Sequence, residues 1–267
     1  MNLRQLAVGF GLVAGSAIAL SSPAQAFSFK EDYTHSLSGG NASKGDIFLD
    51  SITLDSGRVI TDFALVNSAN ILSNDIYTGG NSGAASADIG DLATTGIREE
   101  ALTNEGAKRV MNNLNLNNII DTEDKGNFVL DLHFEQAVDN IFLFERGMNS
   151  RMDVQALDAD GNAIGNLLRL AKSNKWDNAG YKIDTKEIGR KQKVGSIGIS
   201  LADLGLSTGY VSALRVSSKG KSYNGPDFKV FGSVAAEKVP EPSALLGIGM
   251  VVAGLMVSGR RKQAQAS

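Results

Sequence analysis

The sequence has no cysteine, two histidines and four prolines among 267 residues. The lack of cysteine excludes disulfides, thiolate metal sites, iron–sulfur clusters and cysteine nucleophiles. Two histidines leave little for a histidine-based metal site. The 30 glycines have no three-residue period, which excludes a collagen-like helix. Hydrophobic residues make up 42% and charged residues 21%, so the chain has enough apolar material for a core and wholesale disorder is excluded.

The first 26 residues have the pattern of a secretory signal peptide. Arg4 supplies the positive start, and an apolar stretch rich in glycine and alanine runs over residues 6–20. Ala24 and Ala26 form a small-x-small cleavage site for signal peptidase, so we expect Phe27 to be the first residue of the mature chain. An uncleaved anchor helix is the alternative, which the proline at position 23 and this site disfavour.

The C-terminal end has a second hydrophobic segment. Residues 243–259 carry no charge and are followed by Arg260, Arg261 and Lys262. As a helix these 17 residues would span about 25 Å, near the lower limit for crossing a hydrocarbon core. The terminal cations should stay in the cytoplasm, which leaves the bulk of the chain outside. A buried soluble helix is the alternative, but such a helix is seldom apolar on every side.

The residues before this segment carry a resemblance. Pro240, Glu241 and Pro242, followed by a short apolar helix and a terminal Arg-Arg-Lys, resemble the PEP-CTERM sorting signal. The resemblance implies that exosortase, a membrane-embedded cysteine protease or transpeptidase, recognises the tripeptide. Residues 117–124, 144–147 and 154–156 also resemble a cyanobacterial group of exosortase-dependent surface proteins.

The two prolines of the tripeptide also have a direct effect on the backbone. Proline removes a backbone donor and favours an extended chain, which a peptidase cleft can admit just above a bilayer. A proline that only ends a linker before a helix is the alternative.

These features divide the chain into five parts. We expect a signal peptide at 1–26, an extracytoplasmic domain at 27–236, a linker with the PEP motif at 237–242, a transmembrane sorting helix at 243–259 and a basic tail at 260–267. Between Phe27 and Val239, 22 cations face 28 acids, a net charge of −6. General electrostatics therefore predicts no attraction to nucleic acid or anionic lipid.

The central domain is dominated by strand patterns. Phe128, Leu130, Leu132 and Phe134 occupy alternate positions, as expected of a half-buried strand. About nine strands at short spacings predict a mainly β domain, a sandwich or jelly roll. We expect them at 47–54, 59–65, 128–135, 141–146, 152–156, 167–170, 196–201, 213–217 and 228–234.

One region departs from the strand pattern. Residues 79–96 are small and polar and predict a loop, and residues 97–114 have helical spacing of apolar positions. We expect one or two helices to be inserted here near the edge of the sandwich, ending near Asn112.

Asp158, Asp160 and Asn162 form the most ligand-like cluster of the sequence. Three oxygen side chains at alternate positions suit calcium. An EF-hand loop needs glycine and glutamate where this chain has Ala163 and Arg169, and Asp-Gly between apolar runs is a strong hairpin signal. We favour a plain turn, with calcium as the alternative and no other cofactor expected. A second acidic cluster at 121–124 fits a turn or a helix cap better than a metal site.

Two further patterns bear on enzymatic and sugar-binding functions. Ser207 lies in a Gly-x-Ser-x-Gly sequence, but a hydrolase of that type needs a later histidine, and both His35 and His133 precede it. Aromatic side chains in loops or at strand ends can stack on sugars or cover a sandwich edge, and we favour the second use. They are Trp176, Tyr181, Tyr210 and Tyr223.

The sequence therefore predicts a non-catalytic exported protein that is anchored in the inner membrane and then sorted. By resemblance, its home is the cell surface or the extracellular polysaccharide of a Gram-negative cell. The alternative is a glycan-binding jelly-roll module of the extracellular matrix, with or without calcium. A hydrolase is disfavoured because no histidine is placed to serve as a base.

Overall fold

The computed structural model describes residues 27–35, 41–78, 86–89, 98–170, 176–185, 190–207 and 209–235. The expected signal peptide, including Ala24 and Ala26, lies outside the described residues. The same holds for the Pro240–Pro242 motif, the sorting helix and the basic tail. Within the described ranges, no helix is both long enough and apolar enough to cross a membrane.

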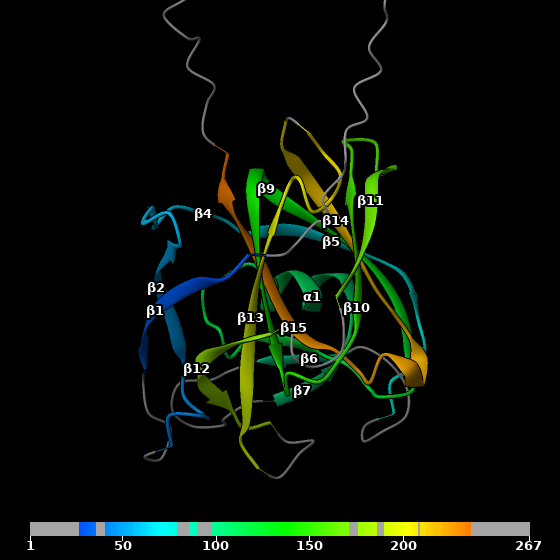
Figure 1. Ribbon diagram of the computed structural model, residues 1–267. Coiled ribbons are helices and arrows are strands. Elements are labelled where there is room, and N and C mark those ends of the chain that lie inside the picture. Colours follow the sequence, from blue (N-terminus) through cyan, green and yellow to red (C-terminus); the bar gives the residue numbers. More distant parts are fainter. Residues whose placement is uncertain are drawn as a thin grey trace, which may run out of the picture.

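The described chain is mainly β, with antiparallel pairing and one α-helix, α1 (Asn104–Met111) (Figure 1). The strands before the helix are β1 (Phe29–His35), β2 (Ile47–Leu54), β3 (Val59–Ile60), β4 (Phe63–Ala64), β5 (Val66–Asn74), β6 (Ser86–Ile89) and β7 (Arg98–Ala101). Those after it are β8 (Ile119–Asp121), β9 (Asn127–Arg146), β10 (Met152–Leu157), β11 (Ala163–Leu170), β12 (Asp177–Ile183), β13 (Gln192–Ser200), β14 (Val211–Lys219) and β15 (Asp227–Val234). A short 3-10 helix, η1, covers Gly220–Ser222.

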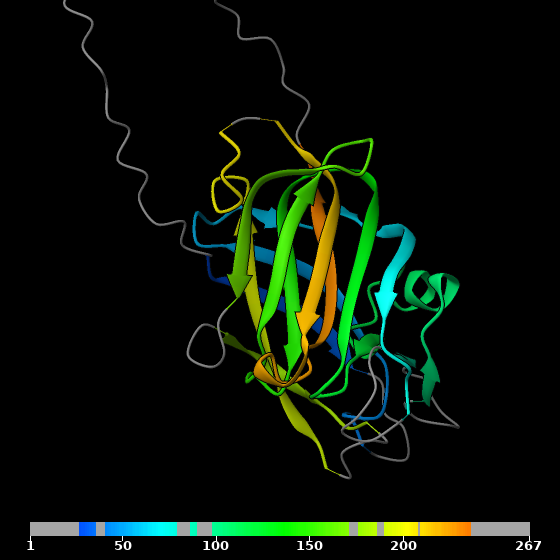
Figure 2. The same ribbon diagram turned by 90° about the vertical axis from the view of Figure 1, so that its right-hand side faces the viewer.

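The long strand β9 organises the fold because its two halves pair with different neighbours. Its first half pairs with β14 on one side and β5 on the other. Its second half pairs with β13 and β15. The strands β11, β10, β14, β9 and β5 lie in that order in one layer, which Figure 2 shows face-on with β5 at its right-hand edge.

Two hydrophobic cores lie on opposite faces of the layer around the second half of β9. Leu143 and neighbouring apolar residues face Leu130, Val154 and Val216 of the other layer. Phe144, on the opposite face of β9, packs in a second cluster. This second core lies against a separate three-stranded sheet in the order β1-β2-β3. Successive side chains of β9 therefore point into two different cores, and the arrangement is consistent with a β-sandwich.

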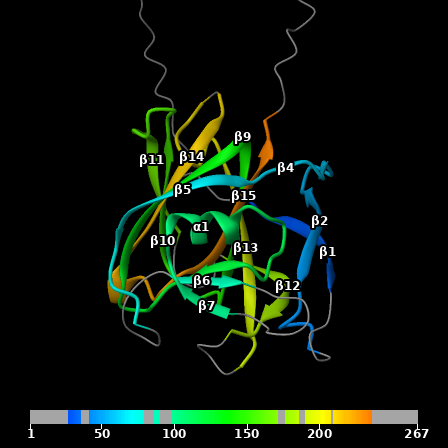
Figure 3. The same ribbon diagram turned by 180° about the vertical axis from the view of Figure 1, so that it is seen from behind.

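The helix α1 packs against β5 and lies between β5 and β6 in the view from behind (Figure 3). The Thr103 side chain accepts a hydrogen bond from the Gly106 N–H and so caps its first turn. At the other end, the buried Lys229 ammonium of β15 donates to the Val110 carbonyl at 2.6 Å and to the Asn113 side chain at 3.0 Å. Burial lowers the pKa of Lys229 well below its usual value. The Val110 carbonyl in the last turn of the helix thus has a partner from the sheet.

The structure corrects three expectations about this domain. The predicted strands at 128–135 and 141–146 are parts of one continuous strand, β9, because each half has its own partners. The expected helix over 97–114 forms only from Asn104 to Met111, since residues 98–101 pair with β6 as a strand. Part of the expected loop at 79–96 is that strand β6, which also pairs with β8.

Candidate functional site

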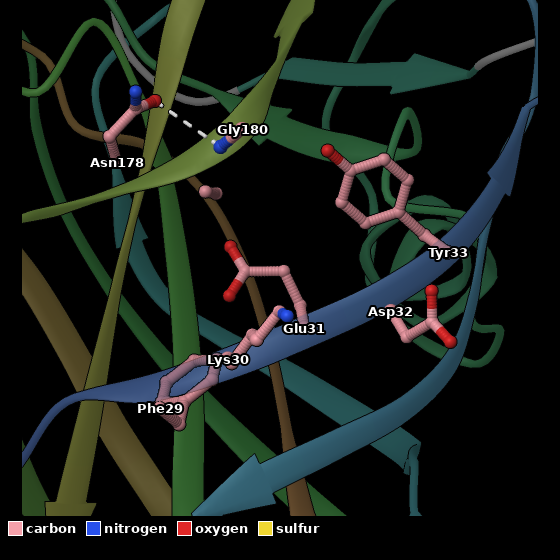
Figure 4. Close-up of a pocket in the computed structure, with 8 residues that line it drawn as sticks. Phe29, Lys30, Glu31, Asp32, Tyr33, Asn178 and Gly180 are labelled. Atoms are coloured by element: carbon pink, nitrogen blue, oxygen red, sulfur yellow. Dashed lines mark hydrogen bonds between the residues drawn. The ribbon is translucent and has the colours of Figure 1, made fainter.

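A pocket lies between β1 and β12, where β1 leaves the edge of β13. Phe27 pairs with Gly198 of β13, and the chain then leaves this edge as β1 and joins the small sheet. From Asp177 onward, β12 takes the place beside β13. The space between the two strands has a volume of about 380 Å³ and is lined by Phe29–Tyr33 and Asn178–Gly180 (Figure 4). We call it the β1–β12 pocket.

Hydrogen bonds and a glycine define the limits of the β1–β12 pocket. Near its start, the Ser28 hydroxyl donates to the Asp177 carboxylate at 2.5 Å. Farther along, Tyr33 lies against Gly180, where a Cβ atom would be only 2.7 Å from the tyrosine oxygen. Gly180 also has a φ of +79°, a conformation that side chains disfavour. This glycine therefore provides both the turn of the strand and the room for Tyr33.

Glu31 is the central ionisable group of the pocket. Its carboxylate and the Tyr33 ring both extend from β1 toward β12, whereas Asp32 points away (Figure 4). Burial raises the pKa of Glu31 to about 7. A hydrogen bond of 3.4 Å from the Ser196 hydroxyl opposes this rise, and the negative charge of Asp177 adds to it. Near neutral pH, Glu31 can therefore either accept or donate a hydrogen bond.

Tyr181 lies beside this group but faces the second core. Its ring contacts that of Tyr33 edge-to-face with centroids 5.3 Å apart, and its hydroxyl makes no hydrogen bond within the described part of the chain. Burial raises the pKa of Tyr181 well above its usual value, and the nearby Glu31 and Tyr33 add to the effect. The phenol therefore stays neutral next to the Glu31 carboxyl group.

A buried charge cluster surrounds Arg146, the last residue of β9. The Arg146 guanidinium donates to Asp227 of β15 at 2.5 and 3.0 Å, to Asp121 of β8 at 3.1 Å, and to the Thr185 hydroxyl. Burial raises the pKa of Asp227 although Arg146 opposes this rise. The Thr122 N–H also donates to Asp227. Each of these side chains is nearly inaccessible, so the cluster holds β8, β9 and β15 together and offers no open site.

Glu145, next to Arg146 in the chain, points to the opposite face of β9 and is fully buried. Burial raises its pKa to about 8. Ser150 and the backbone N–H of Met148 draw the pKa downward, but neither makes a well-formed hydrogen bond to the carboxyl group. Glu145 is thus neutral over much of the physiological pH range.

The proposed calcium ligands lie in the hairpin loop between β10 and β11. Leu157 pairs with Ala163, which leaves the five residues between them as the connection. The Asp158 carboxylate accepts hydrogen bonds from the backbone N–H groups of Asp160 and Asn162, and from the Asn162 side chain at 3.1 Å. Among the described residues, no group of three or more histidine, aspartate or glutamate side chains is arranged to hold a metal ion.

The four aromatic side chains that could stack on sugars differ in exposure. Trp176 and Tyr181 are buried in the two cores, and Tyr223 is buried with its hydroxyl donating to Asp153 at 2.8 Å. Tyr210 is 61% exposed. After Ser207, the strand β14 begins at Val211 and includes the strand expected at 213–217. Sequence reasoning missed Glu31 and Tyr33. Their alternation with Phe29 indicates one face of a strand, but the opposite wall comes from a strand almost 150 residues later.

Comparisons with known proteins identify no family for this chain. No protein-family model and no curated protein matches it. A solved structure of the GH31 α-xylosidase from Xanthomonas citri has 10% sequence identity with this chain and a TM-score of 0.13. The match covers 77% of this chain and 23% of that one. A likeness this weak supports neither a fold assignment nor an activity.

Proposed function

We propose that this protein is an exported, non-catalytic surface or extracellular protein, tethered to the membrane until exosortase processes its C-terminal signal. In this proposal signal peptidase cleaves after Ala26, and exosortase recognises Pro240, Glu241 and Pro242. The helix at 243–259 spans the inner membrane, and Arg260, Arg261 and Lys262 remain in the cytoplasm. The central domain is a jelly-roll-like sandwich.

The observation that best supports this proposal is where the described domain begins and ends. Phe27 pairs with Gly198, which itself pairs with Phe142 of β9. At the other terminus, the Ala235 N–H donates to the Ala137 carbonyl just after β15. Both ends of the described domain therefore lie near the stretch of β9 between Ala137 and Phe142, Phe27 with β13 in between. In this proposal each hydrophobic segment continues from one of these two ends.

Mass spectrometry of the secreted protein from its native host tests the proposal. The wild-type product should begin at Phe27 and lack the segment beyond the tripeptide, whereas Glu241→Ala should retain it. Glu237→Ala is the matched control, because it removes a carboxylate from the same linker but outside the motif. Retention of the tail in all three proteins would exclude exosortase processing, and a product starting before Phe27 would exclude the cleavage site.

The β1–β12 pocket favours a second function, the binding of glycans. Its volume lies within the range of small-ligand pockets, and it combines the Tyr33 ring with the polar groups of Glu31 and Asn178. Rings that cover a sugar face and planar polar groups that meet its hydroxyls are suitable for this purpose. Binding of oligosaccharides to the wild type, lost on Gly180→Ala, would support it. Equal binding by both proteins would place any glycan site elsewhere.

A further inference from the structure

Within the part of the chain that the structure describes, no cation is paired with the Glu31 carboxylate. Among the described residues it forms no ion pair, and its neighbour Lys30, which also lines the pocket, is exposed. The charged and titratable groups that face it are Asp177, Tyr33 and Tyr181, which are acidic or neutral. Its only side-chain hydrogen bond within that part of the chain is the one from Ser196. A carboxylate partly removed from water in such surroundings is stabilised most by a positive charge brought in from outside.

The walls of the pocket suit a cation that carries an organic ring. The Tyr33 ring and Glu31 share one side of β1, so a ligand that reaches the carboxylate also passes the aromatic face (Figure 4). Aromatic rings attract ammonium groups through their negative faces. The Asn178 side chain on β12 accepts a hydrogen bond from the Gly180 N–H, and its amide N–H groups can donate to a hydroxyl. Lys30 also lines the pocket, but the negative charge of Asp177 adds to that of Glu31 and disfavours an anionic group beside the carboxylate.

We propose that the β1–β12 pocket binds a sugar with a free amino group, whose ammonium pairs with Glu31 while Tyr33 and Asn178 contact the ring. The proposal rests on the glycan-binding function above and specifies its ligand class. It requires no covalent step. The burial that raises the pKa of Glu31 gives binding a further consequence, because the ammonium lowers this pKa and Glu31 releases a proton as the complex forms.

The test uses three oligosaccharides of equal length and linkage, built from glucosamine, N-acetylglucosamine or glucose. They differ only in an ammonium, an amide or a hydroxyl group at one carbon. Calorimetric titration of the full-length chain in a neutral detergent near neutral pH should show the glucosamine oligomer binding at least about tenfold more tightly than the other two. Glu31→Gln should abolish this preference.

Two control variants, one for Glu31→Gln and one for Gly180→Ala, distinguish an effect on the pocket from an effect on folding. Asp32→Asn removes the adjacent carboxylate, which points away from β12, and should leave the preference intact. Gly180→Ala should block all binding, whereas Gly57→Ala, with a similar positive φ and nothing near its Cβ position, should not. Far-ultraviolet circular dichroism confirms that each variant is folded.

The outcomes distinguish the two proposals. Equal binding of the glucosamine and glucose oligomers, or an unchanged preference in Glu31→Gln, would overturn the ammonium site but leave a glycan-binding pocket. Binding of none of the three oligomers would overturn both.

Discussion

The Phe27 ring lies over Gly198, in the space that any side chain at position 198 would occupy. The two residues also exchange backbone hydrogen bonds of 2.9 and 2.8 Å. The ring meets those of Phe29 and Phe142 edge-to-face at centroid distances of 6.4 and 6.2 Å. The first residue of the described domain is therefore part of the packing around β13 and β9.

We predict that Gly198→Ala destabilises the protein by about 1–3 kcal/mol, because the new methyl group displaces the Phe27 ring. Urea unfolding of the full-length chain measures the effect. In a Phe27→Ala background the same substitution should have a much smaller effect, since the overlapping ring is gone. Equal effects in the two backgrounds would show that the ring does not occupy this space in solution.

Arg146→Met should lower the free energy of unfolding by about 3–5 kcal/mol, because it leaves the buried carboxylates of Asp121 and Asp227 without their shared cation. The matched control is Arg109→Met, whose ion pair with Glu100 is exposed and should contribute less than about 1 kcal/mol. The two variants can be compared by chemical denaturation in one buffer. Similar losses in both would contradict the structural role of the buried cluster.

Glu145 should make the free energy of unfolding depend on pH. Its pKa is about 8 in the folded protein and 4.5 as an unperturbed group, so the folded state binds more protons between these values. The free energy of unfolding should therefore fall as pH rises through this window, by up to about 1.4 kcal/mol per pH unit from this group.

Glu145→Gln should remove that contribution, so the difference in stability between variant and wild type should grow in the variant's favour from acidic to mildly basic pH. Glu105→Gln, a change at an exposed position, serves as the control and should follow the wild type. A constant difference across the window would mean that Glu145 is not buried as the structure shows.

Chelation of calcium should leave the melting temperature unchanged, because the Asp158 carboxylate already accepts hydrogen bonds within its hairpin loop. Asp158→Ala should lower the melting temperature by the same amount with calcium or with chelator. A rise on adding calcium that Asp158→Ala abolishes would instead support the calcium site considered from the sequence.

Local sequence patterns predicted many of the strands but not which strands pair with one another. The alternation from Phe128 to Phe134 indicates a strand with one buried face, which the structure confirms. The polar residues between this segment and Ile141 suggest a break, yet pairing with β13, β14 and β15 keeps the backbone extended. Residues 98–101 followed helical spacing, but hydrogen bonds to β6 outweigh a weak local preference.

Taken alone, the sequence determined the class of the domain, its Asp158–Asn162 turn and the end of its helix, because each depends on neighbours a few residues away. Only the tertiary structure decided that Tyr33 would lie against Gly180, and that Arg146 would meet Asp121 and Asp227. The burial that shifts the protonation of Glu31 and Glu145 is likewise collective. It arises when strands distant in the chain exclude water together, which no short stretch of sequence records.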